Sequence, residues 1–103
     1  MKKIRFEASQ SLIEKLVKVF IAELGSAQSI PEKLAFALTP STIRVWAEIK
    51  DDDEKIEDAI LLAEAKVNAY ARQFDFALDT MIVEKSDSLP IPSHYAEVTI
   101  KRQ

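Results

Sequence analysis

Two groups of side chains have chemistry that could serve a site: an acidic run and a lone histidine. The acidic run is consecutive, from Asp51 through Glu54, and carboxylate oxygens are ligands that Mg²⁺ and Ca²⁺ accept. A calcium loop, however, spreads its ligands over about a dozen residues around a turn glycine. Carboxylates at the start of a helix satisfy its free N–H groups and its dipole. We therefore interpret the run as a helix cap, and we predict neither a metal nor another cofactor.

His94 is the only histidine of the chain and stands next to Tyr95. A histidine titrates near neutral pH and can act as a general base. No Ser, Asp or Glu stands at a spacing that identifies its partner, so we predict no catalytic residue and expect no enzymatic activity. The chain has no cysteine, which excludes thiolate nucleophiles and cysteine-based zinc sites.

Glycine is equally scarce, because Gly25 is the only one. The phosphate-binding loop and the dinucleotide-binding turn need several glycines for close approach of the backbone. The nucleophile elbow of many hydrolases also has more than one glycine. These classes of nucleotide-binding proteins and hydrolases are therefore excluded by composition.

The overall composition is that of an ordinary globular domain. The 103 residues are 48% hydrophobic and 30% charged, which predicts a single domain over residues 1–103 with one core. The net charge of −3 argues against a nucleic-acid partner. Charged residues interrupt the segment after Met1, and no run approaches the ~20 apolar residues of a membrane span. We therefore expect a cytoplasmic protein without membrane contact.

A long helix from Asp53 to Phe74 is the central predicted element. Its apolar residues are spaced by four and three positions, so they form one stripe: Ile56, Ile60, Ala63, Val67, Tyr70 and Phe74. A wider face that includes Ala59, Leu62 and Ala69 is expected to pack on a sheet. The alternative is a coiled-coil pair with a second chain.

An earlier helix is predicted to end near Gly25. It has an apolar stripe over residues 12–24. Ser11 and Glu14 have the spacing of a capping box at its start. Gly25 is expected to be the left-handed residue that ends the helix.

Five segments have the alternating or apolar pattern of strands: residues 2–6, 33–38, 43–49, 76–85 and 95–101. For residues 33–38 a short helix is the alternative, because Pro31 could stand in a first helical turn. Residues 76–85 are apolar on both faces, which indicates a strand that is central or covered on both sides. The order β-α-β-β-α-β-β predicts an α+β fold, a ferredoxin-like two-layer sandwich with an antiparallel sheet and both helices on one face.

The face of the sheet away from the helices is the predicted binding surface, together with the proline-containing loop 86–93. Arg, Trp, Tyr and Met are enriched in the cores of interfaces, and an apolar loop without a partner is unusual. The candidate binding residues are therefore Arg44, Trp46, Met81, Leu89, Ile91, His94 and Tyr95. The alternative is packing within the fold, with Trp46 as the lid of a partly covered face.

These patterns predict a small, non-catalytic protein that acts by association, as a homo-oligomer or as a subunit of a larger complex. One alternative is a regulatory module that binds a small ligand at subunit edges, with the proline loop as its lid. Another is an RNA-binding platform, in which Lys3, Arg5 and Lys101 join the aromatic residues of the open face. The acidic balance and the missing glycine–aromatic pattern argue against RNA.

Overall fold

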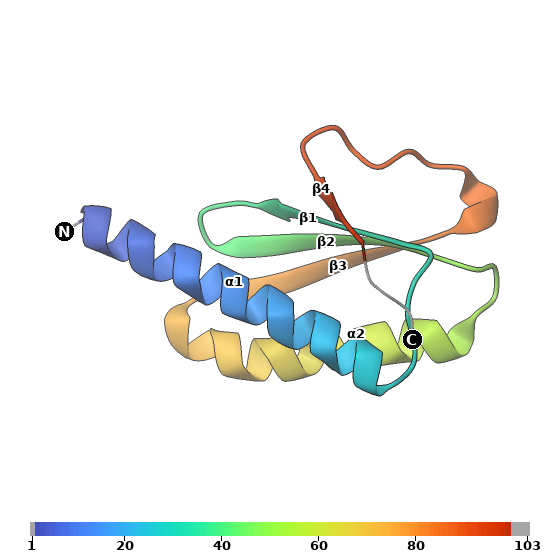
Figure 1. Ribbon diagram of the computed structural model, residues 1–103, viewed down its shortest axis with the longest axis horizontal. Coiled ribbons are helices and arrows are strands. Elements are labelled where there is room, and N and C mark those ends of the chain that lie inside the picture. The colour runs from blue at the N-terminus through green and yellow to red at the C-terminus, as the bar shows by residue number, and fades with distance from the viewer. Residues whose placement is uncertain (1, 100–103) are drawn as a thin grey trace.

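The computed structural model describes residues 2–99 and, for residues 2–10, the backbone alone. It is an α+β domain with two helices and a four-stranded mixed sheet. Its elements are α1 (Lys2–Ser26), β1 (Lys33–Leu38), β2 (Thr42–Ile49), α2 (Glu54–Ala71), η1 (Arg72–Phe74), β3 (Ala77–Glu84), η2 (Lys85–Asp87) and β4 (Ala96–Val98). Both helices lie against one face of the sheet (Figure 1).

The strand order is β3-β2-β1-β4. Strands β1 and β2 form an antiparallel hairpin and β4 pairs antiparallel with β1, whereas β3 runs parallel to β2. The predicted antiparallel, ferredoxin-like sheet is therefore not confirmed. In a split βαβ unit another strand lies between the two parallel strands, and the segment expected to supply it, residues 2–6, belongs to α1 instead.

The helix α1 begins well before the predicted start, and the strand predicted at residues 2–6 is wrong. Five alternating residues are too few to separate a strand from a helix, and no Gly or Pro stands between Lys2 and Ser11. Extending a formed helix adds a hydrogen bond for each residue without a new nucleation cost. Ser11 and Glu14 consequently lie inside the helix and cap nothing. Neither helix of the described chain has both the length and the apolar character needed to cross a bilayer.

The C-terminus of α1 is closed by Gln28 rather than by Gly25. Gln28 has a φ of 55°, its N–H donates to the Gly25 carbonyl, and the Ser29 N–H donates to the Leu24 carbonyl, each at 3.0 Å. This pair of bonds is a Schellman motif with a left-handed residue after the helix. The prediction that Gly25 is the left-handed residue is therefore wrong, because that residue lies three positions later.

The core lies between the two helices and the sheet. The ring of Phe20 on α1 meets the ring of Phe36 on β1 edge to face, with centroids 6.2 Å apart. The predicted inward face of β2 is confirmed, because its alternate residues from Ile43 to Ile49 are buried in this core. The predicted stripe of α2 is confirmed at Ile60, Ala63 and Val67, which are buried, while Tyr70 and Phe74 are exposed at the end of the helix.

The outer edge of β3 is closed by side chains of α2. The Asn68 Oδ1 accepts from the Leu78 N–H at 2.6 Å, and the Asn68 Nδ2 donates to the Leu78 carbonyl at 3.0 Å. The Glu64 Oε2 accepts from the Thr80 N–H at 2.7 Å. Free edges of sheets invite pairing with other chains, so these two side chains supply the hydrogen bonds that a further strand would otherwise make.

We predict that Asn68→Ala destabilises the fold by about 1–3 kcal/mol, because two partly buried backbone groups of Leu78 lose their partner. Alanine is the better helix former, so the helix itself is not the source of the loss. Urea unfolding measures the change, with Gln73→Ala as the control at an exposed amide that bonds only within α2 and η1. Equal stability of the two variants would contradict the assigned role of Asn68.

Candidate functional site

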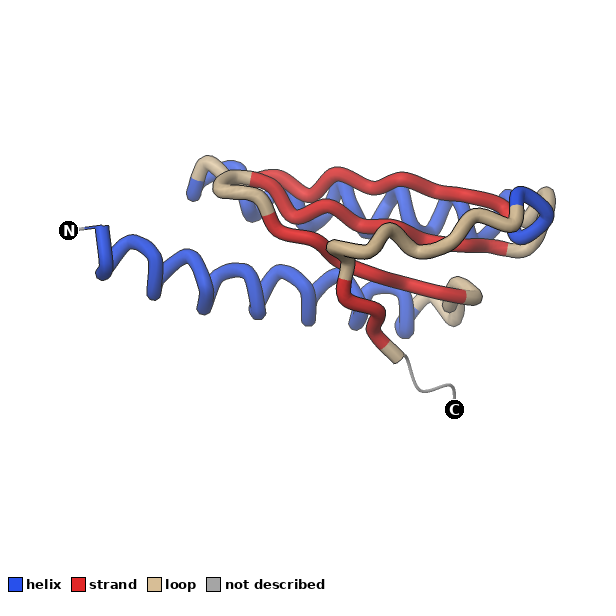
Figure 2. Tube along the Cα trace, turned by 90° about the horizontal axis from the view of Figure 1, so that it is seen from above, coloured by secondary structure: helices blue, strands red, loops and turns tan. Residues whose placement is uncertain are grey.

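Residues 88–95, here called the strap, cross the face of the sheet opposite the helices. The chain leaves β3 at one edge of the sheet and reaches β4 at the other edge. Figures 1 and 2 show the strap passing along the sheet on the side away from α1 and α2. The face that we predicted to be open is therefore covered in part by the chain itself.

The strap packs on a small second core centred on Trp46. Ala35, Trp46 and Val83 are buried together, and Ile91 and Tyr95 of the strap pack against them. Trp46 is only 2% exposed. The alanine at position 35 of the neighbouring strand leaves room for the indole. The structure thus has the arrangement given as the alternative above, in which this face is partly covered by packing within the fold. Trp46 is not the lid, however, but lies beneath the strap.

The remaining candidates stay at the surface. Arg44, Met81, Leu89 and His94 are exposed, and the His94 ring contacts the Tyr95 ring at a centroid distance of 4.7 Å. Among residues 11–99, whose side chains the structure describes, no hydrogen bond joins His94 to a carboxylate or a hydroxyl group. The fold therefore gathers all seven candidates on one face and its strap, without forming a catalytic pair at His94.

An RNA platform gains no support from this geometry. Base stacking needs an exposed aromatic face, and the Trp46 indole is buried. Lys3 and Arg5 belong to helix α1 rather than to a strand, and Lys101 lies outside the described residues.

Two carboxylates of the acidic run, those of Asp51 and Asp53, accept hydrogen bonds from backbone N–H groups. Asp53 caps α2, since its Oδ1 accepts from the Ile56 N–H at 3.2 Å, which confirms the predicted helix cap. The Asp51 Oδ1 accepts from the Ser86 N–H at 2.9 Å. This backbone hydrogen bond, together with the Ser86 side chain and the nearby Lys85 charge, lowers the pKa of Asp51 below 3.8. Over the described chain, no group of three acidic, His or Cys side chains is arranged to hold a metal ion.

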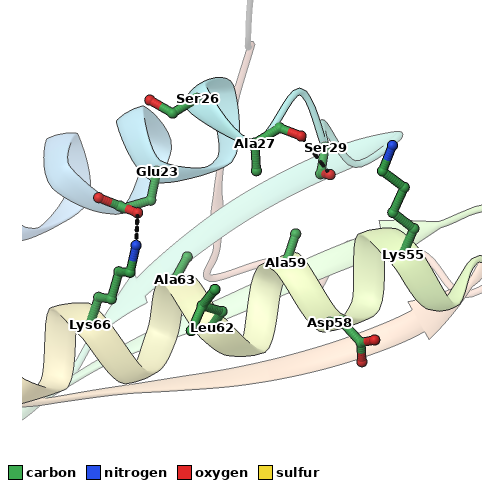
Figure 3. A pocket seen from close by; sticks show the side chains of 10 residues that line it. All are labelled: Glu23, Ser26, Ala27, Ser29, Lys55, Asp58, Ala59, Leu62, Ala63 and Lys66. Carbon is green, nitrogen blue, oxygen red and sulfur yellow. Dashed lines mark hydrogen bonds and ion pairs between the residues drawn. The ribbon is translucent and has the colours of Figure 1, made fainter.

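A groove between the end of α1 and helix α2 was not anticipated. It has a volume of about 450 Å³, and Ala27, Ala59 and Ala63 give it an apolar floor. Figure 3 shows the Glu23–Lys66 ion pair, 3.0 Å long, across one end and Lys55 at the other. The small alanines create the groove, because longer side chains at these positions would fill the space between the helices.

Leu62 stands at the rim of this groove and is 58% exposed. We predicted that Leu62 packs on the sheet, and this is wrong. The residues that contact the sheet, Ile60, Ala63 and Val67, follow a narrower stripe, and Leu62 points away from it. The signal in the sequence was the pair Leu61–Leu62, because two adjacent positions of a helix cannot both lie on one narrow stripe.

The exposed charges of α2 are unevenly distributed along its length. The acidic residues Glu54, Glu57 and Asp58 lie in its first half. Lys66 lies in the second half, and Arg72 follows in η1. Lys55 also lies in the first turn and the last turn of α2 has no basic residue, so the helix dipole accounts only for the acidic residues at the start.

Comparison with known proteins yields no relative: no family model, no curated protein and no solved structure matches the chain.

We predict that Tyr95→Ala uncovers Trp46. The protein has one tryptophan, so its fluorescence reports on this position alone. Emission of the variant should shift to longer wavelength and acrylamide quenching should increase, with a loss of about 2 kcal/mol in unfolding free energy because a half-buried ring is removed. Leu89→Ala is the control within the strap. Unchanged quenching in Tyr95→Ala would show that the strap does not shield the indole.

We predict that the pKa of Asp51 lies below the ordinary value of an aspartate, because its carboxylate accepts the Ser86 N–H, and NMR of its carboxyl carbon measures this directly. Because the folded pKa is lowered, the stabilisation is present above the unfolded value and is lost as the pH falls through the folded pKa. Below about pH 4, the unfolding free energy of Asp51→Asn should therefore decrease less steeply with falling pH than that of the natural protein. An Asp51 pKa that is not lowered relative to an aspartate in a short unstructured peptide would contradict the Ser86 hydrogen bond.

Proposed function

We propose that this protein is a non-catalytic association module that binds a second copy of itself through the outer surface of α2. One observation carries the proposal: a leucine in the middle of a well-packed helix is more than half exposed beside an alanine-lined groove. The surface concerned, called the α2 face, consists of Asp58, Leu61, Leu62, Ala65, Lys66 and Ala69.

The apolar character of the α2 face supports association. Leu61 and Leu62 are exposed side by side, and Ala65 and Ala69 continue the face as exposed small residues. Burying a leucine side chain contributes about 2 kcal/mol, and a symmetric contact gains this twice. Small residues also let a second helix approach closely, which increases the packing contacts that each leucine makes.

The second face of the sheet offers less free apolar surface than we expected. Ile91 and Tyr95 already pack on Trp46 there. An association through that face would therefore newly bury only Met81 and Leu89, which are exposed at its margins. The helical layer exposes Leu61 and Leu62 together, and Val19 on α1 is also exposed. These observations favour the helices as the contact surface.

Binding of a small ligand is the second candidate. The groove volume of about 450 Å³ is within the range of small-molecule sites. Lys55 at one end would be the contact for an anionic group, because Lys66 at the other end is paired with Glu23. A ligand that binds only the folded state raises the unfolding temperature, and the rise grows with the logarithm of the ligand concentration above its Kd. A thermal-shift screen of small acids, with Lys55→Ala as the comparison, separates this candidate from self-association.

We predict that the natural protein has a solution mass of about twice the 11.6 kDa of one chain and dissociates on dilution. Leu62→Asp should be monomeric at the same concentration, because each copy would place a carboxylate in the contact. Light scattering coupled to size-exclusion chromatography measures both.

Leu38→Asp is the matched control, because Leu38 at the end of β1 is also 58% exposed but lies outside the α2 face. It should keep the mass of the natural protein. A natural protein that stays monomeric up to millimolar concentration would refute self-association.

A further inference from the structure

We infer that two copies pair through antiparallel α2 helices, with Leu62 of each copy at the two-fold axis and Asp58 of each facing Lys66 of the other. This arrangement rests on the proposed self-association and specifies its geometry. The observation that carries it is the position of the two opposite charges relative to the exposed leucine.

The charges are placed symmetrically about Leu62. Asp58 precedes it by four residues and Lys66 follows it by four, so all three lie along one ridge of the helix surface. A two-fold axis through Leu62 reverses the helix direction, and it brings Asp58 of one copy to the level of Lys66 of the second. The α2 face is therefore complementary to itself in the antiparallel orientation, whereas a parallel pair in register would oppose like charges.

The surface shape fits the same arrangement. The ridge 58–62–66 borders a depression whose floor is Ala59 and Ala63, which belong to the adjacent ridge. In the commonest class of helix packing, ridges of this spacing fit into each other's grooves at a crossing angle of about −50°. The ridge of a second copy can thus lie in the depression, with its Leu62 at the mouth of the groove in Figure 3.

The two charged side chains are available for this contact. Asp58 is exposed and, in the described part of the chain, is in neither of the two ion pairs. Lys66 pairs with Glu23 at 3.0 Å, yet its side chain is 54% exposed. An ammonium group has three donors, so Lys66 can keep Glu23 and also bind Asp58 of a second copy.

Charge reversal tests the geometry. Asp58→Lys alone places two lysines opposite each other at both ends of the contact, and Lys66→Asp alone places two aspartates there. We expect each variant to weaken dimerisation by about tenfold or more, since opposed like charges in an interface are costly. An equimolar mixture of the two variants should form a heterodimer with both attractive contacts restored, as should the double variant Asp58→Lys/Lys66→Asp with itself.

Sedimentation velocity of the single variants, the mixture and the double variant measures these associations, and circular dichroism confirms that each variant is folded. Recovery of the dimer in the mixture supports the antiparallel pair. A natural protein that dimerises while both single variants dimerise equally well overturns this geometry and leaves self-association standing. A natural protein that never dimerises overturns both.

Discussion

The direct parallel pairing of β2 with β3 is the constraint from which the remaining arrangement follows. Parallel neighbours cannot be joined by a tight turn and need a crossover, which α2 provides. The buried stripe of α2 must then lie on the sheet, where it shares one face with α1. The pairing also leaves β3 at an edge. To reach the free side of β1, the chain has to cross the other face, so the strap over Trp46 is a consequence of the strand order.

Helix α2 has three distinct surfaces because it sits at the margin of the domain. Its apolar stripe packs on the sheet. One polar flank, with Glu64 and Asn68, closes the edge of β3. The third surface, around Leu62, contacts α1 through the Glu23–Lys66 ion pair and is otherwise exposed in the described part of the chain. The first two surfaces take part in the packing of the fold, and the exposed leucines of the third are the basis of the proposed association.

The elements that sequence predicted well are those whose signals are local. The limits of β1 were predicted correctly, and Asp53 was placed correctly at the start of α2, because alternation and capping depend on neighbouring residues. The errors concern partners that lie far away in sequence. The alternating pattern of residues 2–6 could not reveal that no strand was available to pair with them. The two apolar faces of residues 76–85 fit a central strand equally well as an edge strand that is covered by a distant strap. Burial of Trp46 and exposure of Leu62 both depend on such distant contacts.

The pairing of β4 has a consequence for the order of folding. The hairpin of β1 and β2 closes over a few residues, whereas the pairing of β4 with β1 joins Val98 to Leu34, 64 positions earlier in the sequence. Closing so long a loop costs more conformational entropy, and only three residues of β4 are gained in return. Strand β4 and the strap are therefore expected to join a sheet that has already formed and to be the first part to detach by local unfolding. Such a partial opening would expose the second core and the edge of β1 while the helical core stays intact.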